Sequence, residues 1–205
     1  MTMTTLLIAS GNVGKLREIE AILAPVGKDK LPVRLVLPKQ IGLELDVEED
    51  GSNYAENAAK KAQAYAAASG LVTLADDSGL EVDALGGQPG LYSARYAPWD
   101  NATDADRRRY LLENVRDKPQ PWTAHFHCTV AIATPQGEVY YTEGDCPGQI
   151  IPEERGSNGF GYDPIFYLPE LNQTMAELPM EVKNTLSHRA RAVIAALPVL
   201  KKLLG

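Results

Sequence analysis

The spacing of apolar residues changes along this chain from strand-then-helix patterns to strict alternation. Thr4 to Ala9 form an apolar run, after which apolar side chains recur at helical spacing, at Leu16, Ile19, Ile22 and Leu23. From Ala124 to Ile132 every second residue is apolar, and Pro135-Gln136-Gly137 then marks a turn, which predicts a β-hairpin. Helices alternating with strands early and a hairpin late predict an α/β fold: a mixed twisted sheet flanked by helices, with two lobes around a central cleft.

The remaining elements follow from caps and breakers. The alanine-rich stretch from Asn53 to Ser69 opens with a capping-box pattern, Asn53-x-x-Glu56, and closes at Gly70, which predicts a helix. We expect two more helices, from Thr103 to about Val115 and from about Ser187 with a kink at Pro198, and we expect the first helix to end by Pro25 and Gly27. Further strands are expected at Val33–Leu37, Leu71–Ala75, Val139–Tyr141 and Ile165–Leu168, and a long loop at Gly86–Pro98.

The size and charge of the chain limit its possible functions. Its 205 residues suit a single domain, 1–205, built as two lobes. A net charge of −7 disfavours indiscriminate binding to nucleic-acid polymers or anionic membranes. No signal peptide or membrane span is evident, and two cysteines are too few for a secreted disulfide framework. We therefore expect a cytoplasmic protein, in which a local basic cluster must bind any phosphate ligand.

One candidate for that cluster is the segment Ser10-Gly11-Asn12-Val13-Gly14-Lys15, where the first strand meets the first helix. Backbone N–H groups and the positive end of a helix can bind an anion there, and Lys15 would add a charge. The segment is not a Walker A loop, which requires glycine at Ala9 and serine or threonine at Leu16. The alternative is an ordinary turn beside a solvated lysine.

Acidic residues form two candidate metal sites. Asp76-Asp77-Ser78-Gly79 follows an expected strand, and Glu48-Glu49-Asp50-Gly51 precedes the Asn53 helix. Mg²⁺ favours one or two carboxylates together with water and phosphate oxygens. Because adjacent side chains in an extended segment point to opposite faces, one aspartate can bind metal while the other is structural. Both segments could instead be turn caps or a solvated loop.

The second half of the chain offers candidates for binding a planar ligand. Three glycines frame Phe160 and Tyr162 in Gly156–Asp163, which suits an aromatic ring that stacks on a ligand, although Phe160 could instead pack in the core. Three potential donors, Lys183, His188 and Arg189, lie near the start of the last helix. His125 and His127 lack a third ligand and are interpreted as structural. Ser78, His188 and Asp77 could form a Ser-His-Asp arrangement, but no Gly-x-Ser-x-Gly nucleophile elbow occurs in the sequence, which disfavours acyl transfer.

Taken together, these segments resemble the inosine triphosphate pyrophosphatase-like family, the non-canonical purine NTP or dITP/XTP pyrophosphatases. The resemblance covers almost the whole chain and rests on motifs in the family's order: Ser10-Gly11-Asn12-x-x-Lys15-x-x-Glu18, Glu49 followed by Glu56-Asn57-Ala58-x-x-Lys61, Ala75-Asp76-Asp77-Ser78-Gly79-Leu80, Gly90-Leu91-Tyr92-Ser93-Ala94-Arg95-Tyr96, Gly159-Phe160-Gly161-Tyr162-Asp163-Pro164-Ile165-Phe166 and Ser187-His188-Arg189.

The resemblance implies a Mg²⁺-dependent homodimer that hydrolyses dITP, ITP and XTP to the monophosphate and pyrophosphate. By it, Glu49 and Asp77 are the metal ligands, and Asp77 is also the general base. Asp76 binds the metal indirectly or holds the loop. The substrate contacts are Ser10, Gly11, Asn12, Val13, Gly14, Lys15 and Lys61 for the phosphates, Ser78, and Phe160, Gly161, Tyr162, Asp163, Lys183, His188 and Arg189 for the purine and ribose.

Two alternatives remain at this point: a Maf-like pyrophosphatase that acts on modified pyrimidine nucleotides, and a nucleotide sensor without turnover. Base selection is expected to depend on donors. Hypoxanthine and xanthine present a 6-oxo acceptor where adenine presents a 6-amino donor, and Lys183 and Arg189 can only donate. We therefore expect Arg189 to read the base. The dimer contact is expected at Gly86–Pro98.

Overall fold

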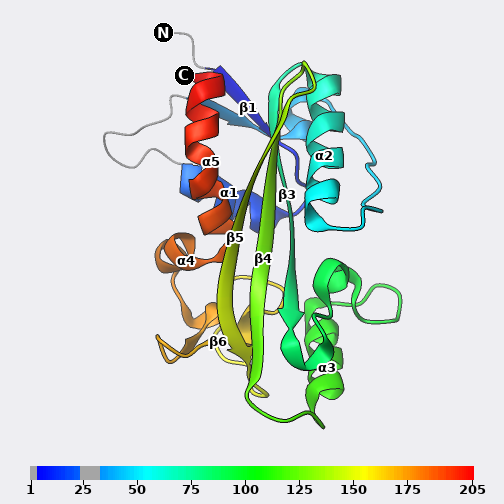
Figure 1. Ribbon diagram of the computed structural model, residues 1–205, viewed down its shortest axis with the longest axis vertical. Coiled ribbons are helices and arrows are strands. Elements are labelled where there is room, and N and C mark those ends of the chain that lie inside the picture. Colours follow the sequence, from blue (N-terminus) through cyan, green and yellow to red (C-terminus); the bar gives the residue numbers. More distant parts are fainter. Residues whose placement is uncertain (1–3, 24–32) are drawn as a thin grey trace. The chain divides into compact units, whose positions relative to one another are not determined.

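The computed structural model describes residues 4–23 and 33–205 and contains a seven-stranded sheet (Figure 1). Its order is β2-β1-β3-β4-β5-β6-β7, where the strands are β1 (Thr4–Ile8), β2 (Val33–Val36), β3 (Val72–Val82), β4 (Trp122–Ala133), β5 (Val139–Ile150), β6 (Phe166–Leu168) and β7 (Gln173–Thr174). β1 pairs in parallel with β2 and β3, whereas β6 pairs antiparallel with β5 and β7. The mixed sheet expected from the sequence is confirmed.

The helices also follow the sequence signals closely. They are α1 (Val13–Leu23), α2 (Tyr54–Ser69), α3 (Asp104–Val115), α4 (Met180–Leu186) and α5 (His188–Leu204). The side chain of Asn53 caps α2 through the Glu56 N–H, and Gly70 ends the helix in the left-handed conformation. α5 continues through Pro198. α4 was not predicted, and the expected stop signals Pro25 and Gly27 lie outside the described residues.

Two segments differ from expectation. β3 does not end at Ala75 but runs on through both aspartates and Gly79 to Val82. The reason is that Asp76 and Asp77 are buried and paired with other side chains, so this part of the chain is not a solvated turn. Within the expected loop Gly86–Pro98, residues Gly90–Arg95 form a 3₁₀ helix. Glycine and proline content alone did not predict that turn.

Contacts between residues divide the chain into two compact units. Unit 1 comprises the described residues of 1–77 together with 128–144 and 189–205, and unit 2 comprises 78–127 and 145–188. The chain passes from one unit to the other after Asp77 in β3, after His127 in β4, after Gly144 in β5 and after His188 in α5. Two of the motifs identified from the sequence therefore contribute residues to both units.

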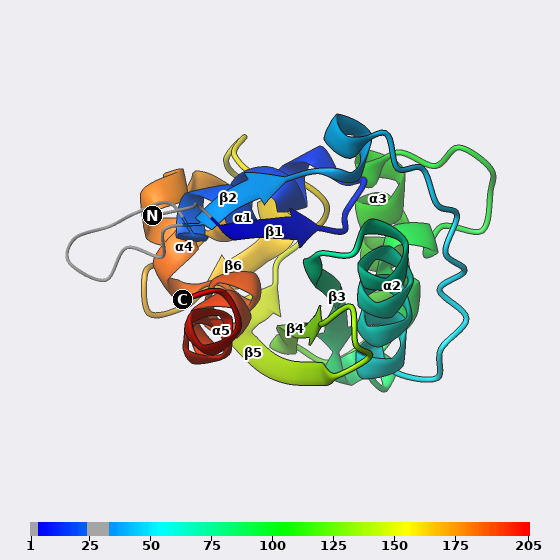
Figure 2. The same ribbon diagram turned by 90° about the horizontal axis from the view of Figure 1, so that it is seen from above.

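Unit 1 packs helices on both faces of its strands, since neighbouring residues of a strand point to opposite faces. Leu74 and Ile132 lie in an apolar cluster with α1 and α5, whereas Ala75 and Ala133 pack with the alanines of α2. Figure 2 shows α2 and α5 on opposite sides of these strands. Alanine on the α2 side lets that helix approach the strands closely, and α2 carries Asn57 and Lys61.

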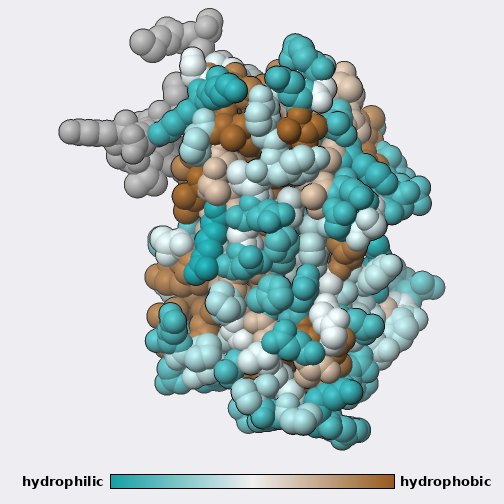
Figure 3. Space-filling view, viewed as in Figure 1, coloured by the Kyte–Doolittle hydropathy of each residue, from teal (hydrophilic) through white to brown (hydrophobic). Residues whose placement is uncertain are grey.

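Unit 2 has its own apolar core around Phe166. The cluster includes Leu111 from α3, Trp122 and Phe126 from β4, and Tyr162. α4 exposes part of its apolar surface to solvent. Apolar side chains gather over it in the space-filling view (Figure 3), and Met180 and Val182 are 47% and 38% exposed. Among the described residues of both units, no helix is long and apolar enough to cross a membrane.

Candidate active site

The predicted phosphate loop joins β1 to α1, as expected. The side chain of Asn12 accepts hydrogen bonds from the backbone N–H of Gly14 at 2.9 Å and of Lys15 at 3.1 Å, and therefore caps the helix. Ser10 in turn accepts from the Asn12 N–H at 3.2 Å. An anion that used the N–H groups of Gly14 and Lys15 would have to displace the Asn12 side chain. The sequence did not predict this cap.

Asp76 is a buried carboxylate surrounded by cations. Its Oδ2 lies 3.0 Å from Lys15 Nζ and 3.1 Å from Arg189 Nε, and Lys61 donates to its backbone oxygen at 3.1 Å. Burial alone would raise the pKa of Asp76, but the charges of Lys15, Arg189 and Lys61 outweigh burial and hold this pKa well below its ordinary value. Asp76 is therefore ionised at neutral pH and holds the ammonium group of Lys15.

Asp77 has the opposite electrostatic environment. Its Oδ2 accepts a hydrogen bond from Asn57 Nδ2 at 3.0 Å. Burial raises the pKa of Asp77, and the nearby negative charge of Glu49 adds to this, while Asn57, Lys15 and Lys61 oppose it without restoring the ordinary value. A carboxylate with a raised pKa is a better proton acceptor than an exposed one. The two neighbouring aspartates thus have different chemical properties.

Glu49 and Lys61 complete this group of charges. They form a short ion pair, and Glu49 lies close enough to Asp77 to raise its pKa. Burial disfavours the charge on Lys61, but Asp76 and Glu49 outweigh it and keep the pKa of Lys61 above its ordinary value. In the part of the chain that the structure describes, no three His, Cys, Asp or Glu side chains converge on one metal position. Glu49 and Asp77 fit an ion that takes its other ligands from phosphate and water.

Asn57 was missed as a functional residue. Its Oδ1 accepts from the Gly51 N–H at 2.7 Å while its Nδ2 donates to Asp77, so this side chain links the acidic loop to the aspartate. The available signal was a buried asparagine in a helix otherwise rich in alanine, because asparagine is a poor helix former that needs another reason to be there. Gly51 has no room for a side chain, since a Cβ there would lie 2.6 Å from Asn57 Oδ1.

Arg189, which the sequence suggested as a residue that reads the base, is paired with two carboxylates. Its side chain is buried in unit 1, where Nη1 pairs with Glu18 and Nε with Asp76. Burial of a guanidinium is tolerated only when carboxylates or other acceptors satisfy it, and these two carboxylates do so. We therefore assign Arg189 a structural role that holds Asp76. Glu18, its other partner, was assigned no role from the sequence.

In unit 2, the glycine-rich loop brings three predicted residues together. Asp163 pairs with the buried amine of Lys183 and accepts from the Phe160 N–H at 2.9 Å, and Lys183 Nζ lies 5.1 Å from the centre of the Phe160 ring. Gly159, at φ +75°, must be glycine, because a Cβ there would lie 2.0 Å from Asp163 Oδ2. The Phe160 ring therefore has a fixed cation beside it.

Other predicted residues of unit 2 are less suited to ligand contact. The side chain of Tyr162 is buried in the core and donates to the Ser93 oxygen at 2.9 Å, so only the backbone of Tyr162 is left for the proposed substrate contact. His188 stacks on Phe126, with ring centres 4.7 Å apart. Ser78 follows Asp77 in β3 and is only partly buried. His127, interpreted as structural, lies 2.7 Å from Asp145.

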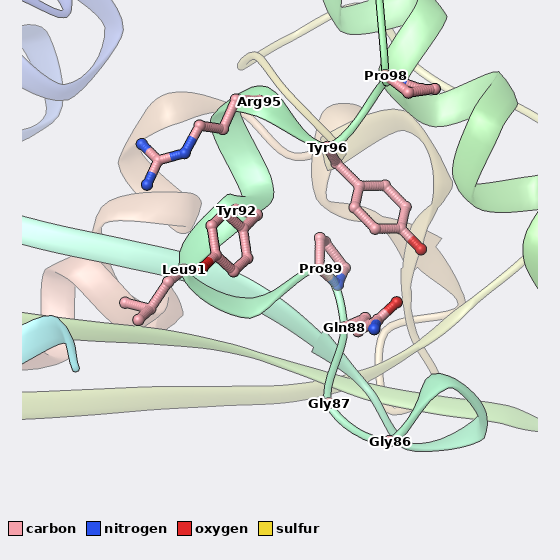
Figure 4. Close-up of a pocket in the computed structure, with 9 residues that line it drawn as sticks. All are labelled: Gly86, Gly87, Gln88, Pro89, Leu91, Tyr92, Arg95, Tyr96 and Pro98. Atoms are coloured by element: carbon pink, nitrogen blue, oxygen red, sulfur yellow. The ribbon is translucent and has the colours of Figure 1, made fainter. Parts of the chain in front are cut away.

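A separate pocket of about 640 Å³ lies in unit 2 (Figure 4). Its lining is mostly apolar and includes Pro89, Leu91, Tyr92 and Tyr96. None of the predicted substrate or metal residues lines this pocket. It belongs instead to the Gly86–Pro98 segment, for which the sequence suggested a contact with another subunit.

Comparison with solved structures defines the class to which this fold and site belong. The HAM1 protein of Coxiella burnetii matches with a TM-score of 0.85 and 39% identity, covering 98% of this chain and all of that one. The Ham1 protein of Staphylococcus aureus matches with a TM-score of 0.83 and 38% identity, over 98% and 100% of the two chains. Each similarity extends over nearly the full length of both compared chains.

Sequence comparison agrees with this class. The profile of the Ham1 family matches residues 6–199. The dITP/XTP pyrophosphatase of Geobacter sulfurreducens is 48% identical over 192 residues, 93% of this chain and 94% of that protein, and the one of Desulforamulus reducens is 46% identical over 200 residues, 97% and 96% of the two. The chain belongs to the Ham1 family, and the resemblance identified from its motifs is confirmed.

Proposed function

We propose that this protein hydrolyses dITP, ITP and XTP to the nucleoside monophosphate and pyrophosphate, and so removes non-canonical purine nucleotides from the nucleotide pool. The proposal rests on the surroundings of Asp77, a buried carboxylate that accepts from Asn57 at 3.0 Å and interacts electrostatically with Lys15, Lys61 and Glu49. This set combines a base with groups that bind phosphate. The names of the relatives, dITP/XTP pyrophosphatases, support the choice of substrate.

In the proposed reaction Asp77 accepts the proton of a water molecule that attacks the α-phosphorus. The bond between the α-phosphorus and the bridging oxygen breaks, and pyrophosphate leaves with the electron pair. Asn57 holds the Asp77 carboxylate through a hydrogen bond of 3.0 Å. The position of the Asp77 carboxylate matters because proton transfer requires it to lie within hydrogen-bond distance of the attacking water.

We propose Glu49 and Asp77 as the ligands of Mg²⁺. When bound, Mg²⁺ would supply positive charge to neutralise the charge that develops on the departing pyrophosphate. This ion usually takes one or two carboxylates from a protein when phosphate and water complete its coordination, and Glu49 and Asp77 match that number. In the structure Glu49 pairs with Lys61, so the carboxylate is already held close to the site.

Lys15 and Lys61 are proposed to bind the phosphates, together with the loop Ser10–Gly14. Both ammonium groups are held by acidic partners, Lys15 by Asp76 and Lys61 by Glu49. An acidic protein of net charge −7 can bind a triphosphate in this way, because the local charge and not the net charge acts at contact distance.

For the base, we propose that Phe160 stacks on the purine and that Lys183 donates to its 6-oxo group. Lys183 is fixed by Asp163 and lies beside the Phe160 ring. An ammonium can only donate, so the 6-amino group of adenine would face a donor and lose a hydrogen bond. Ser78 and His188 stay proposed substrate contacts, whereas Arg189 is not proposed to touch the base.

We further propose that the protein is a homodimer, with the segment Gly86–Pro98 in the contact. This segment lines the mostly apolar pocket of Figure 4, and Tyr92 within it and Trp99 just after it are 61% and 42% exposed. Exposed aromatic side chains are enriched at protein interfaces. A cytoplasmic location is proposed as well, because neither Cys128 nor Cys146 takes part in a disulfide.

A substrate panel tests the proposed function. Pyrophosphate release should be measured with Mg²⁺ for dITP, ITP, XTP, ATP, GTP and a set of modified pyrimidine triphosphates. We expect kcat/KM for ITP to exceed that for ATP by about two orders of magnitude or more, as for a site that must leave a donor unpaired with the wrong base. A preference for pyrimidines would favour the Maf-like alternative, and binding without turnover would favour a sensor.

A further inference from the structure

The backbone of Gly161 is held from two sides by helix α3. Its N–H donates to Asp104 Oδ2 at 2.8 Å, and its oxygen accepts from Arg108 Nη1 at 2.8 Å. Asp104 and Arg108 are one helical turn apart and thus share a face of α3. All three residues belong to unit 2, so this arrangement does not depend on unit 1.

The position of α3 is itself well defined. Thr103 caps the helix in a capping box with Asp106, which fixes the turn that carries Asp104. Arg107 donates to Asp104 Oδ1 at 2.6 Å and to the Ala102 oxygen at 2.7 Å. Burial opposes the charge of Asp104, but the hydrogen bonds from Arg107 and from the Gly161 N–H outweigh burial and keep the pKa of Asp104 below its ordinary value.

Arg108 connects two points of the chain at once. Its Nε and Nη2 bind the carboxylate of Glu154, each at 2.9 Å, while its Nη1 binds the Gly161 oxygen. The guanidinium is planar and rigid, so a bidentate bond on one edge fixes the direction of the remaining donor. Arg108 is only 12% exposed, whereas the next residue, Arg109, is 62% exposed and pairs with Asp106 in its own helix.

Gly161 lies in the chain between Phe160, proposed to stack on the purine, and Asp163, which holds the proposed donor Lys183. Phe160 precedes it, and Asp163, two residues on, accepts from the Phe160 N–H and pairs with Lys183. Gly161 has φ +62°, a conformation that favours glycine. A change in the orientation of either peptide plane next to Gly161 would therefore displace the Phe160 ring relative to Lys183.

We propose that Asp104 and Arg108 are positioning residues for base recognition: by holding both polar groups of Gly161 they keep Phe160 and Asp163 in the geometry that receives the purine. Neither side chain touches the base in this account. The inference rests on the proposed function, since it assigns the Phe160 loop to the base. It adds a determinant of specificity that lies outside the residues matched by the motifs.

The first test compares Arg108→Ala with Arg109→Ala, a neighbouring arginine on the same helix. Hydrogen–deuterium exchange of the peptide spanning 156–163 measures how well the backbone of the loop is protected. Steady-state kinetics with dITP and Mg²⁺ give KM and kcat, and KM reports how well the nucleotide binds. Arg108→Ala should speed exchange in that peptide and raise KM for dITP by about tenfold, the equivalent of one charge-assisted hydrogen bond, with little change in kcat. Arg109→Ala should leave both readouts at wild-type values.

The second test uses Asp104→Asn against Asp104→Ala. Asparagine keeps an oxygen that can accept from the Gly161 N–H, so Asp104→Asn should retain most of the loop protection that Asp104→Ala loses. Equilibrium binding of dIMP, followed by calorimetry, should weaken in the same order as KM rises. A purely structural role of Asp104 in starting α3 would change thermal stability without this rescue.

The possible results distinguish a failure of the positioning role of Asp104 and Arg108 from a failure of the proposed function. If the wild-type protein hydrolyses dITP and Arg108→Ala keeps wild-type KM and dIMP affinity, the positioning role is wrong, whatever the exchange result. Faster exchange with weaker dIMP binding supports it. A wild-type protein that neither hydrolysed dITP nor bound dIMP would overturn the proposed function and this role together.

Discussion

Asp76 and Asp77 are adjacent in the sequence, yet their surroundings give them different chemistry. In β3 their side chains point to opposite faces, so Asp76 meets Lys15 and Arg189 while Asp77 meets Asn57. The pKa of Asp76 is lowered by these cations, and the pKa of Asp77 is raised by burial. Two carboxylates with separated pKa values are suited to two roles, and we propose that Asp76 anchors Lys15 while Asp77 is the general base.

The raised pKa of Asp77 predicts the acidic side of the pH profile. Asp77 acts as a base only when ionised, so kcat should fall about tenfold per pH unit once the pH drops below its pKa. Asn57→Leu removes a hydrogen bond that lowers this pKa, and it should therefore shift the acidic limb to higher pH. A limb that stays in place in Asn57→Leu would belong to the substrate or to another group, and the assignment of Asp77 would fail.

Arg189→Ala tests the structural role that we assign to Arg189. It leaves Glu18 and Asp76 buried without their shared cation, and removing one partner of a buried ion pair costs about 3–5 kcal/mol of unfolding free energy. The ratio of kcat/KM for ITP and ATP should not change. Arg191→Ala, an exposed position on the same helix, is the control and should be nearly neutral. A stable Arg189→Ala protein with a narrowed ratio would restore the base-reading role.

At the scale of the elements, the sequence predicted what local patterns determine. Strand-to-helix periodicity located β1 and α1, Asn53 and Gly70 bounded α2, and the turn after β4 produced the hairpin. Short-range signals suffice for these elements because their caps and apolar faces are written in neighbouring residues.

The features that were not predicted depend on distant partners. Acidic residues usually end strands, because burying a charge is costly. β3 continues because Asp76 meets Arg189, 113 residues away in the sequence, and Arg189 meets Glu18, 171 residues away. Local motifs were enough to identify Lys15, Glu49 and Asp77 as candidates. The contacts of Asn57 and Glu18 are made with residues distant in the sequence, so these two residues were recognised only in the structure.

Helix α2 allows its stability to be separated from its function. Asn53→Ala removes the N-cap and should cost about 1 kcal/mol of unfolding free energy with little effect on kcat. Gly51→Ala places a Cβ 2.6 Å from Asn57 Oδ1, and should lower kcat by displacing the side chain that holds Asp77. Chemical denaturation and dITP kinetics on both variants check this. Loss of kcat in Asn53→Ala alone would contradict it.

For the whole molecule, the proposed homodimer is tested by its mass in solution. Sedimentation equilibrium should give about twice the 22.3 kDa of one chain. Tyr92→Asp puts a charge on an exposed aromatic position of the Gly86–Pro98 segment and should shift the equilibrium toward monomer. A mass of 22.3 kDa for the wild-type protein at working concentration would rule out the dimer.

The residues for which roles are proposed divide between the two units. Unit 1 contains the lysines and carboxylates assigned to phosphates and metal, and unit 2 contains Phe160 and Lys183, assigned to the base. The chain passes between the units next to Asp77 and next to Arg189. Substitutions in unit 2 should therefore change the preference among bases, whereas those in unit 1 should change turnover for all of them.

We propose that Asp77 promotes attack at the α-phosphorus of a non-canonical purine triphosphate. Phosphorus NMR of dITP hydrolysis with Mg²⁺ tests it most directly, with wild-type protein and Asp77→Asn measured side by side. We expect dIMP and pyrophosphate to appear together in the wild-type reaction, and we expect Asp77→Asn, still folded, to be slower by about two orders of magnitude or more. Stepwise release of orthophosphate through dIDP, or near-normal turnover by folded Asp77→Asn, would contradict it.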